Sequence, residues 1–593
     1  MRRVADIIMD ILVENGITDC FAVVGGGAMH LNNALALNDN INKYFNHHEQ
    51  ACSMAASSYA YISGKPAAVI VTSGPGATNA ITGVMGAWQD GLPMIVISGQ
   101  VRYETTAKAC DLPLRYRGIQ EFDIIGSVQN MTKYAKMIID PLSIKHELQK
   151  AIDISFSGRR GPVWLDIPLN VQSSIIEEDE LYSIAAEEKI VLPGISDIEV
   201  KELFELIKNA ERPCFLAGTG LRMSNTVEQF VKFAEISGVP VIGAALAADV
   251  MYREHPNYFG LSGFIGPRTG NFILQNADLI VSFGSSLGFK TTGFAQNQFA
   301  PKSRVVAIDV DEFEMQKPGL NIYKFIHSDL SIFFEKIENK SKPFNIDEKW
   351  LDYCNMLKNK FTPFEAMKNI TDDERVCSYN FWKKFEEYEP SDSISALGNN
   401  TGCSSKLQIG TRKENQRIVT SPNCGSMGLD LPAAIGAAIA SKKDVFCVTG
   451  EGSIMMNLQE LQTIVHYKLP VKLVIFSNDG YAAIRQTSKN FFNGVYVGCT
   501  PDSGISFPDF EKLASVFDSP YHRCNCNGEL DESLEWLCNQ NGFAILEIMQ
   551  KLDDPVTPKV MSRMNADGTF STPALQDMAP FLDKEEIDKL MLW

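Results

Sequence analysis

Short apolar runs alternate with amphipathic, helix-like stretches along most of the chain. The runs expected to be buried strands are residues 20–24, 67–71, 94–97, 163–165, 214–217, 279–283, 305–308, 445–448 and 471–476. Helix-like stretches lie between them, among them residues 51–62 and 456–467. This alternation is typical of parallel sheets covered by helices, and it occurs in three successive blocks.

The three blocks divide the chain into three domains and a tail. The first domain, residues 1–175, ends at the acidic stretch 175–180, and the second spans residues 196–340. A charged, helix-like connector, residues 340–373, leads to the third domain at 375–550. The tail, 551–593, carries turn signals at 565–568 and is expected to wrap a surface. We therefore predict the α/β class, with three consecutive parallel-sheet domains, as the length of 593 residues also suggests.

Composition narrows the class of function. The net charge of −18 and the pI near 5.0 disfavour binding to nucleic acid or to an anionic membrane, which leaves small-molecule chemistry. Thirteen Cys without paired metal spacing indicate reduced, mostly buried thiols. Asp6 and Asp10 interrupt the first apolar stretch at helical spacing, and no run reaches the roughly 20 apolar residues of a membrane span. We expect a cytoplasmic protein.

Two strand ends in the third domain carry a candidate metal site. The strand at 445–448 runs into Gly450-Glu451-Gly452-Ser453, and the strand at 471–476 runs into Asn478-Asp479-Gly480-Tyr481. Parallel sheets bind ligands at the carboxyl edge, where helix N-termini offer N–H groups to phosphate. Mg²⁺ prefers oxygen ligands, and Glu451, Asn478 and the Gly480 carbonyl would fit. A lone G-x-G is more often a tight strand–helix turn, so the second motif is what favours the site.

Gly450-Glu451-Gly452, followed after 25 residues by Asn478, resembles the Gly-Asp-Gly…Asn signature of thiamine-diphosphate enzymes. Two departures are Glu451 for the usual Asp and Ser477 for the first of the usual paired Asn. The resemblance implies that Gly425 offers its carbonyl to the aminopyrimidine and that Met427 separates the two cofactor rings. It implies further contacts to the cofactor from Asn399, Asn400, Thr401, Ser426, Gly450, Gly452, Ser453 and Tyr481.

A second motif in the first domain supplies a candidate activating carboxylate. Glu49 precedes the helix-like stretch 51–62, and a glycine-rich segment, residues 72–79, follows the next strand. A Glu at a helix start is usually a surface group that complements the helix dipole. The resemblance instead implies that Glu49 bonds pyrimidine N1′ and favours the imino tautomer, whose nitrogen takes the C2 proton. It also directs Thr72, Pro75, Asn79 and Gln120 toward the cofactor.

Further residues follow from the same resemblance. Gly25, Gly26 and His30 lie after the first strand, where relatives line the substrate side; His30 is either a proton relay or a structural residue. In the middle domain, 218–220, 263–268, 284–286 and 309–311 resemble the positions at which acetolactate synthases hold a non-redox FAD. Other relatives hold ADP there or nothing, so the glycines are alternatively plain sheet turns.

The resemblance to acetolactate synthases extends from Val4 to about Pro555. It implies a homodimer or homotetramer with the active site between subunits, and a carboligase acting on pyruvate or another 2-oxo acid. Residues 482–487 lack the Trp used against a second 2-oxo acid. The run 484–492, with the tail around 567–568 and 577–580, resembles homologues associated with surface-polysaccharide genes, which suggests a keto-sugar nucleotide as the carbonyl acceptor. The alternatives are a 2-oxo acid acceptor, a simple 2-oxo-acid decarboxylase, and a non-catalytic paralogue, against which the presence of Glu49 counts.

Overall fold

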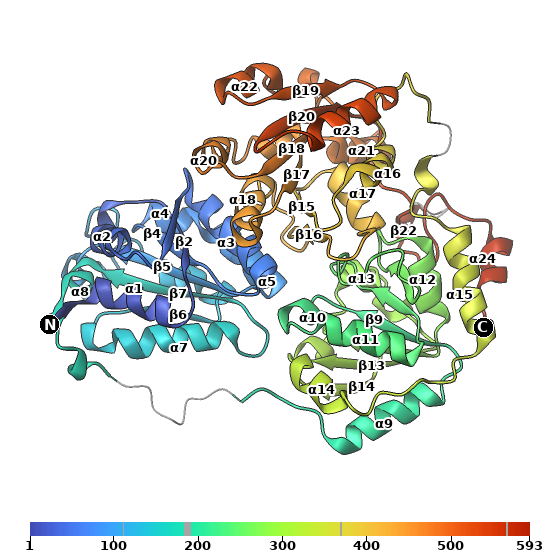
Figure 1. Cartoon of the computed structure of the whole chain (residues 1–593), viewed down its shortest axis with the longest axis horizontal. Coiled ribbons are helices and arrows are strands. Elements are labelled where there is room, and N and C mark those ends of the chain that lie inside the picture. The colour runs from blue at the N-terminus through green and yellow to red at the C-terminus, as the bar shows by residue number, and fades with distance from the viewer. Residues whose placement is uncertain (111, 183–190, 368–369, 565–566, 568) are drawn as a thin grey trace.

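Three six-stranded sheets, each fully parallel, form the body of the protein. The computed structural model describes residues 1–110, 112–182, 191–367, 370–564, 567 and 569–593. Figure 1 shows the first domain in blue and cyan, the central domain mainly in green, and the third domain in yellow to red. The predicted α/β class with three parallel-sheet domains is confirmed.

Each predicted apolar run overlaps a strand of one of the three sheets. The first sheet has the spatial order β3 (Asn42–Phe45), β2 (Asp19–Ala22), β4 (Ala68–Val71), β5 (Met94–Gln100), β7 (Pro162–Pro168), β6 (Tyr134–Met137). The central sheet has the order β11 (Tyr258–Leu261), β10 (Val241–Gly243), β9 (Pro213–Ala217), β12 (Leu279–Phe283), β13 (Arg304–Asp309), β14 (Ile322–His327). The third sheet has the order β16 (Arg417–Val419), β15 (Ile394–Leu397), β17 (Val445–Gly450), β18 (Val471–Ser477), β20 (Ala544–Met549), β19 (Tyr521–Cys524). The predicted strands are β2, β4, β5, β7, β9, β12, β13, β17 and β18, and the other strands of the three sheets were not predicted.

The first and third sheets share one strand order, and the central sheet has another. Numbered within each domain, the outer two read 2-1-3-4-6-5, whereas the central sheet reads 3-2-1-4-5-6. The latter is the order of dinucleotide-binding sheets, whose crevice opens at the carboxyl ends of strands 1 and 4. In this chain those strands are β9 and β12.

Helices cover the sheets and join the domains. The principal ones are α1 (Val4–Glu14), α2 (Met29–Leu37), α3 (Glu49–Ser63), α5 (Ile81–Asp90), α7 (Ile144–Phe156), α9 (Asp197–Lys208), α11 (Val227–Ser237), α12 (Arg268–Asn276), α14 (Leu330–Ile337), α15 (Glu348–Lys360), α16 (Ser378–Tyr388), α17 (Thr401–Ile409), α18 (Asp430–Ser441), α21 (Ala482–Phe491) and α23 (Leu530–Cys538). Helix α3 of the first domain packs on α18 of the third, where the Ser58 hydroxyl donates to the Ala433 carbonyl at 2.9 Å.

The described part of the tail lies across the central domain. The Asn271 amide donates to the Leu575 carbonyl at 3.1 Å, and the Asn276 amide donates to the carbonyl of Leu590, in the last helix α24 (Lys584–Leu590), at 3.0 Å. Met578 is fully buried in this contact. Of the turn predicted at 565–568, residues 565, 566 and 568 lie outside the described part of the chain.

One predicted helix is wrong in its extent. Residues 456–467 were expected to form a single helix, but the chain forms α19 (Glu451–Ile454) directly after β17 and α20 (Glu460–His466) after a turn. The side-chain amide of Asn457 explains the break, because it donates to the Gly428 carbonyl at 2.7 Å and to Gln50 Oε1 at 3.0 Å. A fully buried Asn that bonds two other segments holds the chain out of helical geometry.

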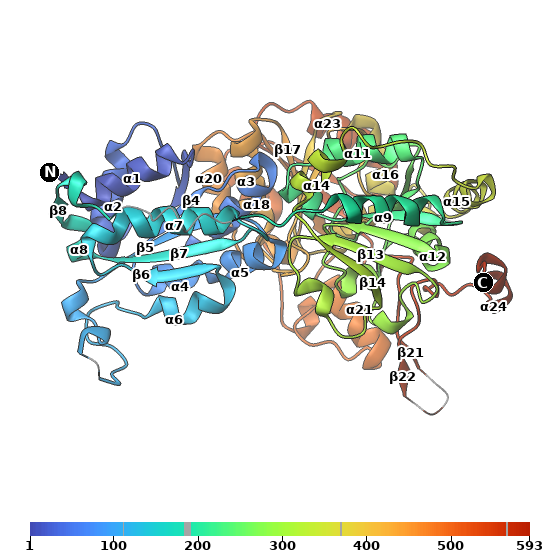
Figure 2. The same cartoon turned by 90° about the horizontal axis from the view of Figure 1, so that it is seen from below.

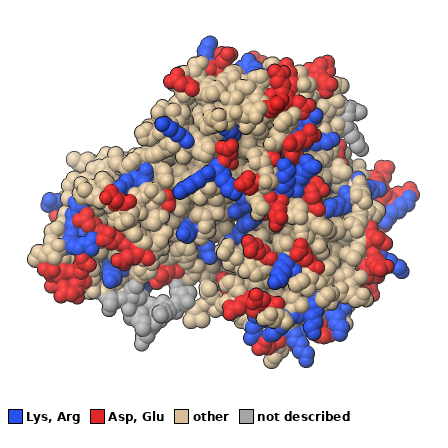
Figure 3. All heavy atoms as spheres, viewed as in Figure 1, with Lys and Arg blue, Asp and Glu red and all other residues tan. Residues whose placement is uncertain are grey.

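Two expectations from composition can also be compared with the structure. All thirteen cysteines are free thiols and most are buried, as predicted. Across the described residues, every helix is too short or too polar to cross a membrane. On the face drawn in Figure 3, acidic and basic side chains intermingle and form no continuous basic surface.

Candidate active site

Glu49 begins α3 at the carboxyl edge of the first sheet. The imidazole of His48 caps the helix, because its Nδ1 accepts from the Gln50 backbone N–H at 3.0 Å. Glu49 is only 9% exposed, and its Oε2 accepts from the Asn79 side-chain amide at 3.0 Å. Within the described residues, no hydrogen bond engages the other carboxylate oxygen, Oε1. The structure thus brings Glu49 and Asn79 together and leaves one carboxylate oxygen of a largely buried side chain for a ligand.

The segment after β4 packs tightly beneath Glu49. Thr72 Oγ1 accepts from the Gly27 N–H at 3.0 Å, and a Cβ placed on Gly25 would lie 2.5 Å from Thr72 Cβ. A Cβ on Gly76 would lie 3.1 Å from Glu49 Oε1. These contacts gather Gly25 and Thr72 around Glu49, with Gly26 beginning the 3₁₀ turn Gly26–Ala28 and Pro75 beginning the short helix α4 (Pro75–Asn79).

Gln120 and His30 lie at the margin of this cluster. Gln120 is exposed, has a left-handed φ of 63°, and turns its carbonyl toward Gly74, where an added Cβ would lie 2.5 Å away. His30 is half-buried in the first turn of α2, and burial followed by the nearby Arg3 charge lowers its pKa. No hydrogen bond among the described residues joins His30 to Glu49. The proton-relay role of His30 stays a prediction.

Glu451 occupies the end of β17 and reaches across to the neighbouring strand end. Its carboxylate accepts from the Asn478 N–H at 3.1 Å and from the Gly480 N–H. Burial raises the pKa of Glu451 to about 7, although these two N–H groups act in the opposite direction. The extra methylene relative to Asp is what lets the carboxylate span this gap. Gly480 has a φ of 148°, and a Cβ there would lie 2.0 Å from the Cys499 carbonyl, so only glycine fits.

Asn478 is fixed on both sides of its amide. Its Nδ2 donates to Gln550 Oε1 at 2.9 Å, and Arg485 Nη2 donates to its Oδ1 at 3.0 Å and to its backbone carbonyl at 2.8 Å. Gln550 in turn donates to Thr401 Oγ1 at 2.9 Å. Gln550 was not predicted from the sequence. It directly follows the apolar strand β20, the same signal that identified Asn478.

The remaining third-domain candidates surround this edge. Asn400 caps α17 through its Oδ1, which accepts from the Cys403 N–H at 2.9 Å, whereas its buried Nδ2 has no hydrogen-bond partner in the described part of the chain. The Asn399 amide donates to the Gly425 carbonyl at 2.5 Å. A Cβ on Gly450 would lie 3.1 Å from Asn400 Cβ. The Ser453 hydroxyl donates to the Asp430 carboxylate and accepts from the Gly428 N–H. The ring of Tyr481 packs on Gly452. Ser426 and Met427 are half-buried.

Two residues that sequence reasoning assigned only to a helix hold the two halves of one chain together. Glu460 accepts from the Asn46 side-chain amide at 2.8 Å and from the His47 N–H at 3.0 Å, directly before Glu49. Asn457 bonds Gln50 on α3. Even so, no hydrogen bond within the described residues links Glu49 or Asn79 to Glu451, Asn478 or Gly480. The carboxylate half and the metal half are therefore two separate half-sites on the chain.

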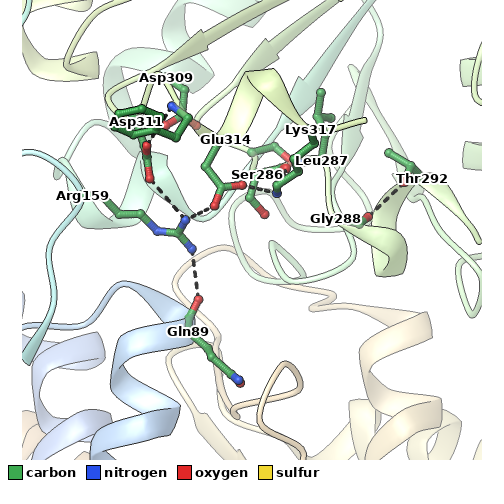
Figure 4. A network of polar contacts seen from close by, with 12 residues as sticks. Gln89, Arg159, Ser286, Leu287, Gly288, Thr292, Asp309, Asp311, Glu314 and Lys317 are labelled. Atoms are coloured by element: carbon green, nitrogen blue, oxygen red, sulfur yellow. Dashed lines mark hydrogen bonds and ion pairs between the residues drawn. The ribbon is translucent and has the colours of Figure 1, made fainter. Parts of the chain in front are cut away.

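The carboxyl edge of the central sheet faces a cavity of about 900 Å³ and a smaller adjoining one. Figure 4 shows Arg159 reaching this edge from the first domain toward Asp311 and Glu314 of the central domain. Burial raises the pKa of Asp309 at the end of β13 to about 6. Residues from three of the predicted segments line this region: Thr219, Gly220, Gly284, Ser286, Asp309 and Asp311.

The fourth predicted segment, residues 263–268, does not line these two cavities. Arg268 is 2% exposed beneath the tail, where its guanidinium donates to the carbonyl oxygens of Met578, at 3.2 Å, and Pro580. The prediction that residues 263–268 contribute to a nucleotide site is therefore not met by Arg268. The hydrogen bonds of its side chain go to the tail. A sequence motif alone does not reveal such tertiary contacts.

Both half-sites fit the groups that the sequence implies. The unpaired Asn400 Nδ2 is a donor suited to a phosphate oxygen, and it lies at the N-terminus of α17. Glu451, Asn478 and Gly480 offer three oxygen types that suit Mg²⁺. The available Oε1 of Glu49 suits a ring nitrogen that carries or receives a proton.

Comparisons with known proteins agree with this architecture. Three family models match the chain: "Thiamine pyrophosphate enzyme, N-terminal TPP binding domain" over residues 2–127, the corresponding central domain over 200–330, and the C-terminal TPP binding domain over 400–548. Each match falls within one of the three sheet domains, and together they cover more than half of the chain.

Full-length relatives show the same extent of similarity. Acetolactate synthase isozyme 2 large subunit from Escherichia coli (strain K12) is 28% identical, over 91% of this chain and 94% of the relative. A probable acetolactate synthase large subunit from Methanocaldococcus jannaschii is 29% identical, over 92% and 91%. The chloroplastic acetolactate synthase of Arabidopsis thaliana is 27% identical, over 96% and 84%.

Proposed function

Because this chain belongs to the thiamine pyrophosphate enzymes, we propose that it decarboxylates pyruvate or another 2-oxo acid and transfers the remaining two-carbon unit to a carbonyl acceptor. It is a thiamine-diphosphate-dependent carboligase of the acetolactate synthase type. The observation that carries the proposal is the buried Glu49 carboxylate, held by Asn79 with Oε1 left available.

Each half-site has a separate task in this proposal. Thiamine diphosphate, when bound, supplies the carbon nucleophile and the electron sink for decarboxylation. Glu49 holds a proton at Oε1 toward the pyrimidine ring, and Asn79 fixes the direction of that carboxylate. Glu451, Asn478 and the Gly480 carbonyl would hold Mg²⁺, while Asn400 and Thr401 at the start of α17 would bind the diphosphate.

We propose that the smallest active unit is a homodimer. Within the described residues no hydrogen bond links Glu49 or Asn79 to Glu451, Asn478 or Gly480 of the same chain, so we propose that a partner supplies the complementary half-site. The segment between β5 and α6 (Ile124–Val128) extends away from the first domain in Figure 2. It carries Gln120 and exposes large apolar side chains, with Ile119 88% and Tyr116 73% exposed. Exposed apolar groups of this kind mark interaction surfaces, and a homotetramer is the next larger alternative.

The central domain supports a bound nucleotide, for which we propose FAD. The strand order and the turns after β9 and β12 match a dinucleotide site, and Asp309 after β13 lines the same cavity. Arg159 neutralises Asp311 and Glu314 beside it. Flavin absorbance of the purified protein tests this proposal, because denaturation would release the bound FAD into solution. Release of an adenine nucleotide without flavin would favour ADP.

Two classes of compound are candidates for the carbonyl acceptor, a 2-oxo acid and a keto-sugar nucleotide. The segment of α21 that lacks Trp favours the keto-sugar nucleotide over a second 2-oxo acid, and a simple decarboxylase is the second candidate function. The Glu49–Asn79 pair counts against a non-catalytic paralogue, because only the catalysed reaction requires it.

The test is incubation of the enzyme with pyruvate, thiamine diphosphate and Mg²⁺, with carbon dioxide, acetaldehyde and acetolactate all measured. Carbon dioxide release is expected, and Glu49→Gln should lower its rate by orders of magnitude while thiamine diphosphate still binds. Glu14→Gln, on the exposed face of α1, is the matched control. Stoichiometric acetaldehyde with every acceptor tried would replace the ligase with the decarboxylase; no carbon dioxide at all would refute both.

A further inference from the structure

A cavity of about 430 Å³ lies between the central and third domains, beside the third-domain half-site. From the third domain it is lined by Asn399, Asn400, Thr401 and Gly425, and from the central domain by residues that follow β10, β11 and β12. Its volume falls within the range of about 300–1,000 Å³ that is usual for small-molecule sites. The third-domain lining residues are also candidate cofactor contacts, so the acceptor would occupy the part of the cavity nearer the central domain and the tail.

The charge of this cavity is unusual for this chain. Two lysines line it, Lys290 from α13 (Phe289–Thr292) and Lys559 from the tail, and no Asp or Glu belongs to the lining. The whole chain has a net charge of −18, so a cationic cavity is not a consequence of composition. Neither lysine forms an ion pair within the described residues. Burial lowers the pKa of both ammonium groups; on Lys290 the nearby Asp90 charge acts in the opposite direction, whereas no such charge acts on Lys559 among the described residues.

The two lysines are held in place by one residue between them. The Phe264 N–H donates to the Lys290 carbonyl at 3.2 Å, and the Val560 N–H, next to Lys559, donates to the Phe264 carbonyl at 2.7 Å. Lys559 also exchanges two backbone hydrogen bonds with Ala579, at 2.9 and 2.8 Å. The tail is thereby fixed against the central domain, and the two side chains reach one cavity from separate elements.

Each ammonium group keeps donors for a ligand. Lys559 Nζ donates to Gln486 Oε1 at 2.7 Å, and Lys290 Nζ donates to the Pro422 carbonyl. An ammonium group has three donors, so two remain on each side chain. Lysine binds phosphate as a point charge, whereas planar carboxylates are usually held by the fork of an arginine. Two lysines without an arginine therefore suit a phosphate group.

We propose that Lys290 and Lys559 form the subsite for a phosphate or diphosphate group of the carbonyl acceptor, which makes the acceptor a phosphorylated compound. This assignment rests on the proposed carboligase function and specifies its second substrate. The competing sources of the same chemistry are the diphosphate of thiamine diphosphate itself and, for Lys290, which also lines the central cavity, the phosphates of a nucleotide bound there. The third domain already offers Asn400 Nδ2, the start of α17 and the Glu451 metal site for the cofactor diphosphate, and both lysines lie on other elements.

The test ligand is dihydroxyacetone phosphate, and uncharged dihydroxyacetone is the control compound. Isothermal titration to the enzyme loaded with thiamine diphosphate and Mg²⁺, without pyruvate, should show binding of the phosphate compound only. Lys290→Met and Lys559→Met should each weaken that binding about tenfold, since each removes a charge-assisted contact. The affinity for thiamine diphosphate should stay at the wild-type value. Lys489→Met, an exposed lysine of α21 paired with Asp553, should change neither.

Three results overturn the proposal: no binding of the phosphate compound to the wild-type enzyme, equal binding by all variants, or variants that lose thiamine diphosphate instead. The last result would assign the lysines to the cofactor. Carbon dioxide release from pyruvate is followed separately, so that failure of the enzyme to decarboxylate is recognised apart from failure of the acceptor site. Circular dichroism of the variants establishes that they are folded.

Discussion

At residue 451 a single methylene changes how the carboxylate is held. Glu451 bridges from the end of β17 to the N–H groups of Asn478 and Gly480, which follow the neighbouring strand β18. An Asp at this place has a shorter reach, so the longer side chain is compatible with the wider gap. The departure from the usual Asp is then an adaptation of the site and not a sign that the site is lost.

We predict that Glu451→Gln weakens Mg²⁺-dependent binding of thiamine diphosphate at least about tenfold. The amide keeps an acceptor for one loop N–H but loses the charge that the metal requires. Titration of thiamine diphosphate at several Mg²⁺ concentrations measures the effect. Glu535→Gln, an exposed residue of α23, is the control. An unchanged Mg²⁺ dependence would remove Glu451 from the metal site.

At the scale of elements, α3 and α18 bring the first and third domains into contact. Gly436 of α18 faces α3 so closely that an added Cβ would lie 2.0 Å from the Ala55 carbonyl and 2.2 Å from Ser58 Oγ. Both neighbours belong to a helix in which backbone atoms cannot yield without moving the whole element. Because α3 also begins with Glu49, the separation of the two helices governs the position of the carboxylate.

Gly436→Ala should therefore lower stability by roughly 1–3 kcal/mol, the usual cost of overpacking, and should also lower catalytic activity. Thermal unfolding followed by fluorescence, together with the pyruvate assay, measures both effects. Gly126→Ala in α6 is the matched control, since its nearest neighbour would be the Asp123 carboxylate at 3.7 Å. A variant with wild-type stability would show that α3 and α18 separate without cost.

The same elements show what the sequence could and could not predict. Strands such as β12 and β17 are buried on both faces, so their continuous apolar runs revealed them. Glu49, Glu451 and Asn478 were predicted because each lies beside a recognisable element within a motif that resembles the thiamine-diphosphate enzymes. The break at Asn457 and the burial of Arg268 depend on contacts with distant segments, to Gln50 and to the tail. Lys559 carried no local signal at all, since only the fold brings the tail to the cavity.

At the scale of the whole molecule, two sheets with one strand order flank a third with another. The outer sheets carry the two half-sites at their carboxyl edges, while the central sheet has the order of a dinucleotide-binding domain. Arg159 and Asn457 show that polar contacts, and not only apolar packing, join the domains. Because buried polar groups respond to pH, the stability of the assembled chain should depend on pH beyond what its surface charges require.

Asp166 is the clearest such group. It is fully buried in β7, where it accepts from the Ser98 hydroxyl at 2.6 Å and from the Gln100 amide at 3.1 Å, and burial raises its pKa from 3.8 to about 7. A carboxyl whose folded pKa is raised binds its proton more tightly in the native state. Its contribution to stability therefore falls as pH rises from about 4 to 7, and the penalty is complete above pH 7.

We predict that Asp166→Asn removes this penalty, because its amide can donate to Ser98 while its carbonyl accepts from Gln100. The stability of the variant relative to the wild-type protein should rise between pH 5 and 8, toward a difference of about 2–4 kcal/mol. Thermal midpoints measured across this range test the sign, with Asp153→Asn on the exposed face of α7 as the control. A difference that stays constant with pH would mean that Asp166 does not hold its proton in the folded protein. A stabilised variant would show that this carboxyl is kept at a cost to the fold.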